Sequence, residues 1–119
     1  MTTLLFLLLI AGLGGLGSVL RMLLSRFSGK LPWGILIANT LASVVAGMFL
    51  AGPNPAVPYA LLVVGFAGGL STFSSWAAQT GAYWQAGQYR KATYNAALNL
   101  LLPASGVIAG ALFAYTLLK

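Results

Sequence analysis

Hydroxyl side chains gather in one otherwise apolar stretch of this chain, where their protons could bind an anion inside a membrane. Four of them follow the glycine pair Gly68-Gly69 within a few positions: Ser71, Thr72, Ser74 and Ser75. Irregular backbone at bilayer depth is tolerated only where protein buries it or a wet path passes. Interrupted membrane helices direct carbonyls, amides and helix ends toward ions. We therefore predict that this helix is broken at the paired glycines and forms the functional centre.

Two amide side chains are expected at membrane depth near this segment. Asn39 lies in the middle of an earlier apolar segment, and Asn99 lies shortly before Pro103 in a later one. A side-chain amide can donate two hydrogen bonds, and polar residues inside membrane helices usually face the bundle interior. For Asn39 we favour a place on an ion pathway over the alternative, a hydrogen bond between helices. Pro103 is expected to kink its helix and to free the carbonyl of Asn99.

Phe73 and Trp76 are three residues apart and therefore share one face of a helix. The edge of an aromatic ring carries partial positive charge and could weakly stabilise a bare anion. Ordinary packing is the more common role of aromatic residues at this spacing, and composition alone favours it. Arg21, near the end of the first apolar segment, has two interpretations. Its side chain reaches the membrane interface, or it attracts anions at the mouth of a pathway.

The composition is that of a membrane protein that handles an anion or a neutral solute. Of the 119 residues, 60% are hydrophobic and 5% charged, with six Lys and Arg, no Asp or Glu, no His and no Cys. Cation pumps and proton-coupled carriers commonly rely on an intramembrane carboxylate, which this chain lacks. The six cations are better explained as orientation signals than as a nucleic-acid surface. We expect neither a nucleic-acid partner nor an enzymatic activity.

Four apolar segments are long enough to cross a bilayer, which needs about 20 residues. They predict an all-α membrane protein with one four-helix domain over residues 1–119, its helices spanning residues 3–24, 33–51, 57–83 and 92–118. Four crossings place loops 25–32 and 87–91 on the same side, and these loops carry most of the positive charge. We expect a protein of the inner or plasma membrane. The positive-inside rule then places both loops in the cytoplasm and both termini outside.

Small residues recur where helices would need to approach closely. The last segment has such a face in Gly106, Gly110 and Ala114, and glycines cluster in the first segment at positions 14, 15 and 17. Faces of this kind favour close packing between membrane helices. We expect them to join subunits into at least a dimer. The alternative is that they serve contacts within one subunit.

Three motifs, in order, resemble those of the CrcB/Fluc fluoride channel family over nearly the whole chain. They are GGLGSVLR at residues 14–21, PWGILIAN at residues 32–39 and GFAGGLSTFS at residues 65–74. The resemblance implies a passive, fluoride-selective channel that exports fluoride from the cytoplasm, with two pores at the interface of an antiparallel dimer. It also implies a structural sodium ion at the centre of the dimer, held by the backbone carbonyls of Gly68 and Ser71.

With this resemblance, the predicted fluoride pathway comprises Arg21, Asn39, Thr72, Phe73, Ser74, Ser75, Trp76 and Asn99. The chain departs from the family pattern at three notable positions: Trp76 replaces a phenylalanine, Gln79 a glutamate and Pro103 a serine. Its charge bias favours one orientation in the membrane, whereas the implied dimer pairs two opposite orientations. Both points favour a heterodimer with an inverted partner of opposite bias over a homodimer.

Two other functions remain open. The altered pore residues are compatible with a non-conducting subunit that stabilises a partner in the lipid bilayer. A small multidrug-type transporter has a similar size and also pairs antiparallel. Such transporters depend on a glutamate in their first helix, however, and this chain contains no glutamate. The fluoride channel is therefore the favoured interpretation.

Overall fold

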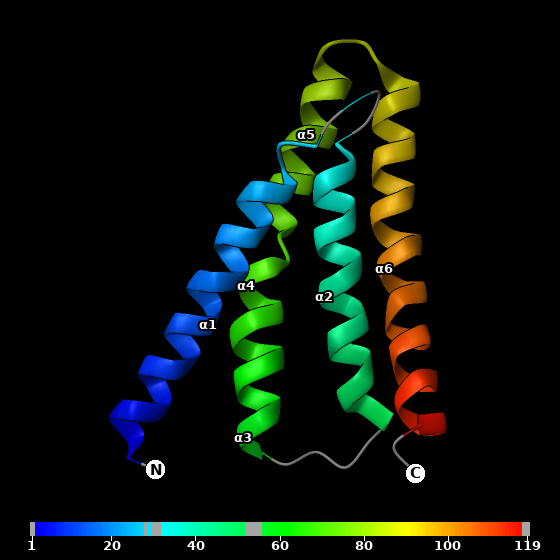
Figure 1. Cartoon of the computed structure of the whole chain (residues 1–119). Helices are drawn as coiled ribbons and strands as arrows, with labels where there is room; N and C mark the ends of the chain where they lie inside the picture. Colours follow the sequence, from blue (N-terminus) through cyan, green and yellow to red (C-terminus); the bar gives the residue numbers. More distant parts are fainter. Residues whose placement is uncertain (1, 28, 30–31, 52–55, 118–119) are drawn as a thin grey trace.

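The computed structural model describes residues 2–27, 29, 32–51 and 56–117 (Figure 1). The elements within that part are helical: α1 (Thr3–Leu24), α2 (Trp33–Ala51), α3 (Ala56–Tyr59), η1 (Ala60–Ala67), α4 (Gly68–Leu70), α5 (Phe73–Gln85) and α6 (Tyr89–Leu117). The run from α3 to α5 forms one discontinuous rod, so the chain has the four predicted helical segments. The all-α prediction is confirmed. The last helix begins three residues before the predicted 92, and the predicted end at 118 lies outside the described residues.

Three helical stretches of the described chain are long and apolar enough to cross a membrane: Thr3–Leu24, Ala60–Gln85 and Tyr89–Leu117. The stretch from Trp33 to Phe49 is apolar as well, but shorter. Large apolar side chains such as Leu8 and Ile108 are exposed on the outside of the helices. Exposed apolar surface of this extent suits contact with lipid. The chain is a multi-pass membrane protein.

Helices α2 and α6 lie side by side and approach closely through glycines (Figure 1). A Cβ atom added to Gly47 would clash with the backbone of Val107, and one added to Gly110 would clash with the backbone of Val44. Gly106, one turn before Gly110, is buried on the same face. The expectation that this face of the last helix joins two subunits is therefore wrong. Its small residues serve a contact within one subunit.

Helix α1 packs in the same way against the discontinuous rod. A Cβ atom added to Gly17 would clash with the carbonyl of Phe66, and one added to Gly69 would clash with the backbone of Gly14. Gly15, in contrast, would meet nothing within 4 Å. Gly69, one of the two glycines expected to break the helix, instead lets α1 approach the rod closely.

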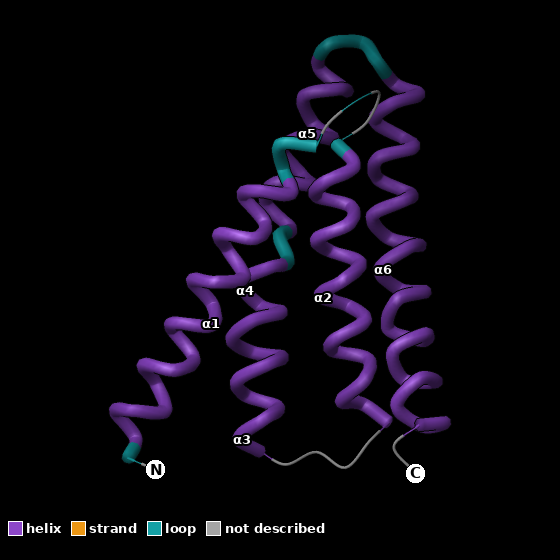
Figure 2. Tube along the Cα trace, in the orientation of Figure 1, coloured by secondary structure: helices purple, strands orange, loops and turns teal. Residues whose placement is uncertain are grey.

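The third rod is interrupted at Ser71 and Thr72, where Figure 2 shows a loop between α4 and α5. Both residues have extended backbone, with φ −78° and ψ 155° at Ser71 and φ −153° and ψ 119° at Thr72. The predicted break is present, but it follows Leu70, and the glycine pair itself remains helical. Just before α4, the eight residues of η1 are wound as a π-helix. Such windings are rare and frequently occur near functional sites.

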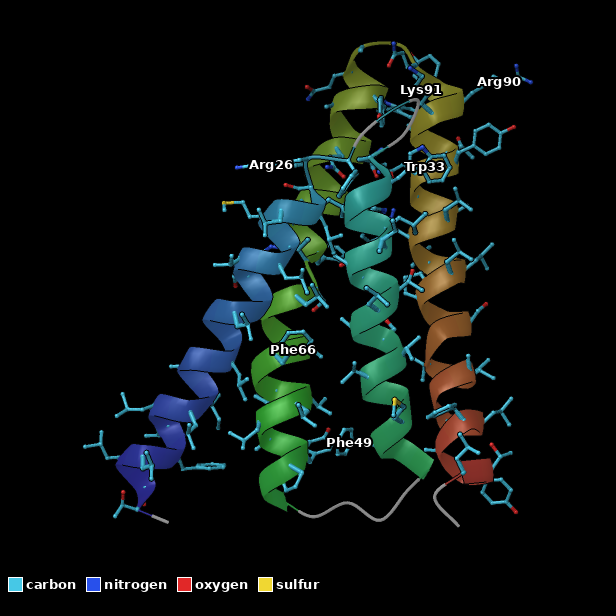
Figure 3. The ribbon with its side chains drawn as sticks, in the orientation of Figure 1. Arg26, Trp33, Phe49, Phe66, Arg90 and Lys91 are labelled. Carbon is cyan, nitrogen blue, oxygen red and sulfur yellow. The ribbon has the colours of Figure 1, made fainter. Side chains whose placement is uncertain are left out.

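Helices α1 and α5 end, and α2 and α6 begin, at one end of the bundle, whereas α1 begins and α6 ends at the other (Figure 1). Arg26, Arg90 and Lys91 lie at the end where α2 and α6 begin (Figure 3). The predicted grouping of positive charge is therefore present in the described part of the chain. Lys30 and Lys119, which belong to the same prediction, lie outside the described residues.

Candidate functional site

Asn39, on α2, pairs with the backbone where the third rod is interrupted. Its Oδ1 accepts a hydrogen bond from the Thr72 N–H at 2.8 Å, and its Nδ2 donates to the Thr72 carbonyl at 3.2 Å. Thr72 is only 8% exposed, so its extended backbone would otherwise leave polar groups unsatisfied inside the protein. The Asn39 amide thus gives both backbone groups of Thr72 a partner and stabilises its extended conformation inside the protein.

A series of side-chain amides continues from Asn39 onto α6. The Asn39 Nδ2 also donates to Oδ1 of Asn99 at 3.1 Å. The Asn99 Nδ2 donates to the backbone oxygen and to Oδ1 of Asn95, at 3.0 and 3.2 Å. The Asn95 Nδ2 donates to Oγ1 of Thr80 on α5 at 2.9 Å. These bonds connect three helices through the interior of the bundle.

Both N–H groups of the Asn39 amide are therefore engaged by the protein. The alternative interpretation of this residue, a hydrogen bond between helices, describes the contacts that its side chain makes. Its place on an ion pathway stays a prediction. Sequence reasoning missed Asn95, although its spacing of four residues from Asn99 places both on one helix face.

The hydroxyl residues form the first turn of α5. Oγ1 of Thr72 accepts a hydrogen bond from the Ser75 N–H at 3.1 Å and lies 3.3 Å from Oγ of Ser74. Backbone amides at the start of a helix carry partial positive charge and favour anions. Because α5 begins inside the bundle, it supplies positive potential there without a charged side chain. Sequence analysis did not identify this helix start, but Thr72 is a typical N-cap residue.

An open groove of about 350 Å³ lies beside the break and brings together most of the predicted pathway residues. Its lining is Asn39, Ser43, Ser71, Thr72, Phe73, Trp76, Asn99, Leu100 and Pro103. Among the other predicted residues, Ser74 and Ser75 lie in the adjoining turn of α5, and Arg21 approaches the break from α1. The structure therefore gathers the predicted residues around one interruption, along the groove and the segments next to it.

Phe73 and Trp76 form an edge-to-face pair, with ring centroids 5.1 Å apart and planes at 77°. The indole Nε1 of Trp76 donates to the backbone oxygen of Asn95 at 3.2 Å, so this side chain is fixed to α6. Phe73, in contrast, is 73% exposed at the rim of the groove. Its ring is therefore presented to whatever covers the groove.

The carbonyls of Gly68 and Ser71 lose their usual helical partners at the break. In a continuous α-helix the Thr72 N–H would bond to the Gly68 carbonyl, but here it donates to Asn39. The Ser75 N–H would likewise bond to the Ser71 carbonyl, but it donates to Oγ1 of Thr72. Both carbonyl residues line a second hollow, of about 240 Å³.

Arg21 reaches the break from α1. Its Nη1 donates to the Ser71 carbonyl at 3.4 Å, and one turn earlier Oγ of Ser18 donates to the Gly69 carbonyl at 3.3 Å. A cation near the carbonyl end of a helix is stabilising. Helix α1 thus provides two donors to the carbonyls that α4 leaves at its end. Neither interpretation made from the sequence describes this contact, because both direct the Arg21 side chain toward an aqueous mouth or interface.

A bundle of four helical rods, one of them interrupted at hydroxyl and amide residues within apolar surroundings, defines a membrane protein that handles ions. The family model described as "CrcB-like protein, Camphor Resistance (CrcB)" matches residues 8–111. The chain belongs to this family, the CrcB/FluC fluoride channel family, whose members are ion channels rather than enzymes.

Several relatives are similar over most of their length. The "Fluoride-specific ion channel FluC" of Koribacter versatilis is 38% identical, over 84% of this chain and 89% of that protein. The protein of the same name from Clostridium novyi is 35% identical, over 89% of this chain and 91% of that protein. The relative from Xanthomonas axonopodis pv. citri is 48% identical over a shorter region, so that this chain spans 59% of its length.

Proposed function

We propose that this chain is a subunit of a passive, fluoride-selective channel that exports fluoride from the cytoplasm. The observation that carries the proposal is the interruption at Ser71 and Thr72, which starts a helix inside the bundle beside hydroxyl and amide groups. A small anion must exchange its hydration shell for donors that do not hold it too tightly. Relatives named as fluoride-specific ion channels, similar over most of the chain, support the choice of ion.

The donors of the proposed pathway are weak and carry no full charge. The Ser74 and Ser75 hydroxyls can turn their protons toward an ion, and the first turn of α5 adds positive potential. Phe73 offers the edge of an exposed ring. An ion that uses the Asn39 amide must replace one of its two present acceptors, the Thr72 carbonyl or Asn99 Oδ1. That competition keeps binding weak, which favours release.

The groove is open, and we propose that a second, inverted subunit completes it. The exposed Phe73 ring at its rim would then meet the partner rather than lipid. The cations at one end of the bundle favour a single orientation, with the connections after α1 and α5 in the cytoplasm. An inverted partner is then more readily a different chain of opposite bias than a flipped copy, so a heterodimer is favoured over a homodimer.

The carbonyl oxygens at the break fit a sodium ion at the centre of that dimer only in part. The carbonyls of Gly68 and Ser71 would hold it, because oxygen is the ligand that hard cations prefer and both carbonyls have lost their helical partners. When bound, the ion would supply positive charge that stabilises an anion nearby. The Arg21 contact opposes the fit, because it brings a cation to the Ser71 carbonyl and uses one of its lone pairs. The second lone pair of that carbonyl is left for the ion.

The proposal is tested with the assembly that a tagged copy of this chain forms in its own membrane. The purified assembly is placed in liposomes loaded with potassium fluoride or potassium chloride, and anion efflux is followed with ion-selective electrodes. We expect fluoride to leave and chloride to remain. An assembly that retains fluoride as well as protein-free liposomes do would overturn the channel proposal. Rapid fluoride efflux through this chain alone would overturn the heterodimer.

A non-conducting subunit is the second candidate, because the polar N–H groups of Asn39 and Trp76 are engaged within the chain. Replacing Asn39 and Phe73 with apolar or bulkier residues in the native assembly separates the two functions. The channel proposal expects slower fluoride efflux from these variants. Unchanged efflux would show that these side chains are scaffolding and that the partner conducts.

A further inference from the structure

We infer that Asn95 is a positioning residue, which holds the side-chain amides of Asn99 and Asn39 in place beside the helix break. Its side chain is 2% exposed, and it is one of the two largest fully buried side chains of the described residues. Its amide donates to Thr80 on α5 and accepts from Asn99, while its backbone oxygen accepts from Trp76. Asn95 lies outside the proposed pathway, and its effect on transport rests on the proposed function.

The direction of the amide series is fixed at its Thr72 end. A backbone N–H can only donate, so the Asn39 atom that meets it is Oδ1, and the Asn39 Nδ2 then points to Asn99. Asn99 must present Oδ1 to that donor, and its own Nδ2 is therefore turned toward Asn95. This reasoning assigns every oxygen and nitrogen of the three amides from one donor that cannot be flipped.

Asn95 supplies the acceptor on which this arrangement ends. Without its Oδ1, the Asn99 Nδ2 keeps one acceptor, the Asn95 backbone oxygen at 3.0 Å. The N–H that faced Oδ1 is then unsatisfied in a buried site, and the Asn99 amide is held in place by one hydrogen bond fewer. A less firmly held Asn99 side chain weakens the hydrogen bond that its Oδ1 accepts from the Asn39 Nδ2 beside Thr72. Asn39 keeps its two bonds to the Thr72 backbone, but its Nδ2, which donates to both Thr72 and Asn99, is less firmly fixed.

Asn95→Leu tests this inference, with Thr80→Val as the matched control. Leucine removes the acceptor that faces Asn99, whereas valine removes only the Thr80 hydroxyl at the far end of the series. The chain has four asparagines, so ¹⁵N-asparagine labelling gives a simple spectrum of side-chain amides in detergent. We expect Asn95→Leu to shift the Asn39 signals and to speed their hydrogen exchange about tenfold, the scale of one net hydrogen bond. Thr80→Val should leave them in place.

Transport by the native assembly gives the second measurement. We expect Asn95→Leu to reduce the discrimination of fluoride over chloride about tenfold, with Thr80→Val close to the unmodified assembly. If Asn95→Leu does not fold, Asn95→Ser, whose hydroxyl is too short to replace Oδ1, is measured in the same way. Unchanged Asn39 signals in a folded variant would overturn the inference while leaving the fluoride channel intact. Shifted signals in the variant, together with no fluoride efflux through the unmodified assembly, would support the positioning role and overturn the proposed function.

Discussion

Asn39 pairs with Thr72 much as a neighbouring strand pairs with a residue of a sheet, because its amide contacts both the N–H and the carbonyl of that residue. This arrangement explains how an extended backbone exists at membrane depth without unsatisfied groups. It also explains why a single amide lies in the middle of an otherwise apolar helix. The pair also fixes where α5 begins.

The first prediction concerns the stability of the break. Asn39→Leu leaves both Thr72 backbone groups and Asn99 Oδ1 without a partner, and each buried unsatisfied group costs about 1–3 kcal/mol. We expect the free energy of unfolding, measured by denaturant titration in detergent, to fall by more than about 2 kcal/mol. Ser43→Ala, one turn further along α2, is the control and should stay within about 0.5 kcal/mol. Equal stability of the two variants would contradict the assigned role.

The second prediction concerns Trp76. Trp76→Phe removes the hydrogen bond from the indole Nε1 to the Asn95 backbone oxygen but keeps an aromatic ring beside Phe73. We expect a loss of about 1 kcal/mol in the free energy of unfolding, the net value of one hydrogen bond. Fluoride efflux from the native assembly should continue, because the indole N–H is engaged by the protein and not by the ion. Efflux that stops in this variant would show that the indole itself serves the ion.

Residue types predicted the location of the site better than its bonds. Hydroxyls and amides in apolar surroundings correctly identified a group of residues that the fold gathers at one interruption. The bonds of Asn39 to Thr72 and of Arg21 to Ser71 could not be predicted, because both partners are backbone groups whose positions depend on where the helix breaks. Asn95 was missed because its spacing of four residues from Asn99 places both on one helix face but does not say whether that face is buried.

At the scale of helices, the glycines act mainly by letting two helices approach each other closely. The glycine pair 68–69 stays helical, and Gly69 brings the backbone of α1 close to the rod. The extended residues are Ser71 and Thr72, whose side chains can compete for backbone hydrogen bonds and so favour the ends of helices. The length of apolar runs predicted the number of helices and most of their bounds. It could not place the break, because a glycine can interrupt a helix or allow two helices to pack closely.

The third prediction tests the role of glycine in α1. Gly17→Ala places a methyl group against the Phe66 carbonyl and should push α1 away from the rod. Alanine at Gly15 meets nothing within 4 Å and should be neutral or stabilise the helix, by up to about 1 kcal/mol. Thermal unfolding of the two variants in detergent checks this. A Gly17→Ala variant as stable as Gly15→Ala would contradict the close packing of α1 on the rod.

At the scale of the whole molecule, Arg26, Arg90 and Lys91 lie at one end of the bundle and an open groove lies beside the break. The first feature predicts a defined orientation, and the second predicts a partner. The first feature follows from composition and helix order, whereas the sequence anticipated a partner only through small-residue faces and the family resemblance. The identity of the partner could not be predicted, because it depends on a surface that this chain does not contain.

The fourth prediction concerns orientation. The chain has no cysteine, so a single introduced thiol reports its position without interference. In intact cells, Gln88→Cys, in the connection after α5, should be protected from a membrane-impermeant maleimide, whereas Thr2→Cys, just before α1, should react. Disrupting the cells should expose the first site. Labelling of about half the molecules at each site would contradict a single orientation and favour a homodimer.

The central claim is that fluoride crosses the membrane beside the break, and a thiol at the rim of the groove tests it most directly. Phe73→Cys and Ile108→Cys each replace an exposed apolar side chain, the first at the groove and the second elsewhere on the surface of the subunit. A thiol-specific reagent is added to the assembly in liposomes, and fluoride efflux is measured before and after. The account predicts that modification stops efflux through Phe73→Cys and leaves Ile108→Cys and the unmodified assembly unchanged. Undiminished efflux after complete modification of Phe73→Cys would contradict it.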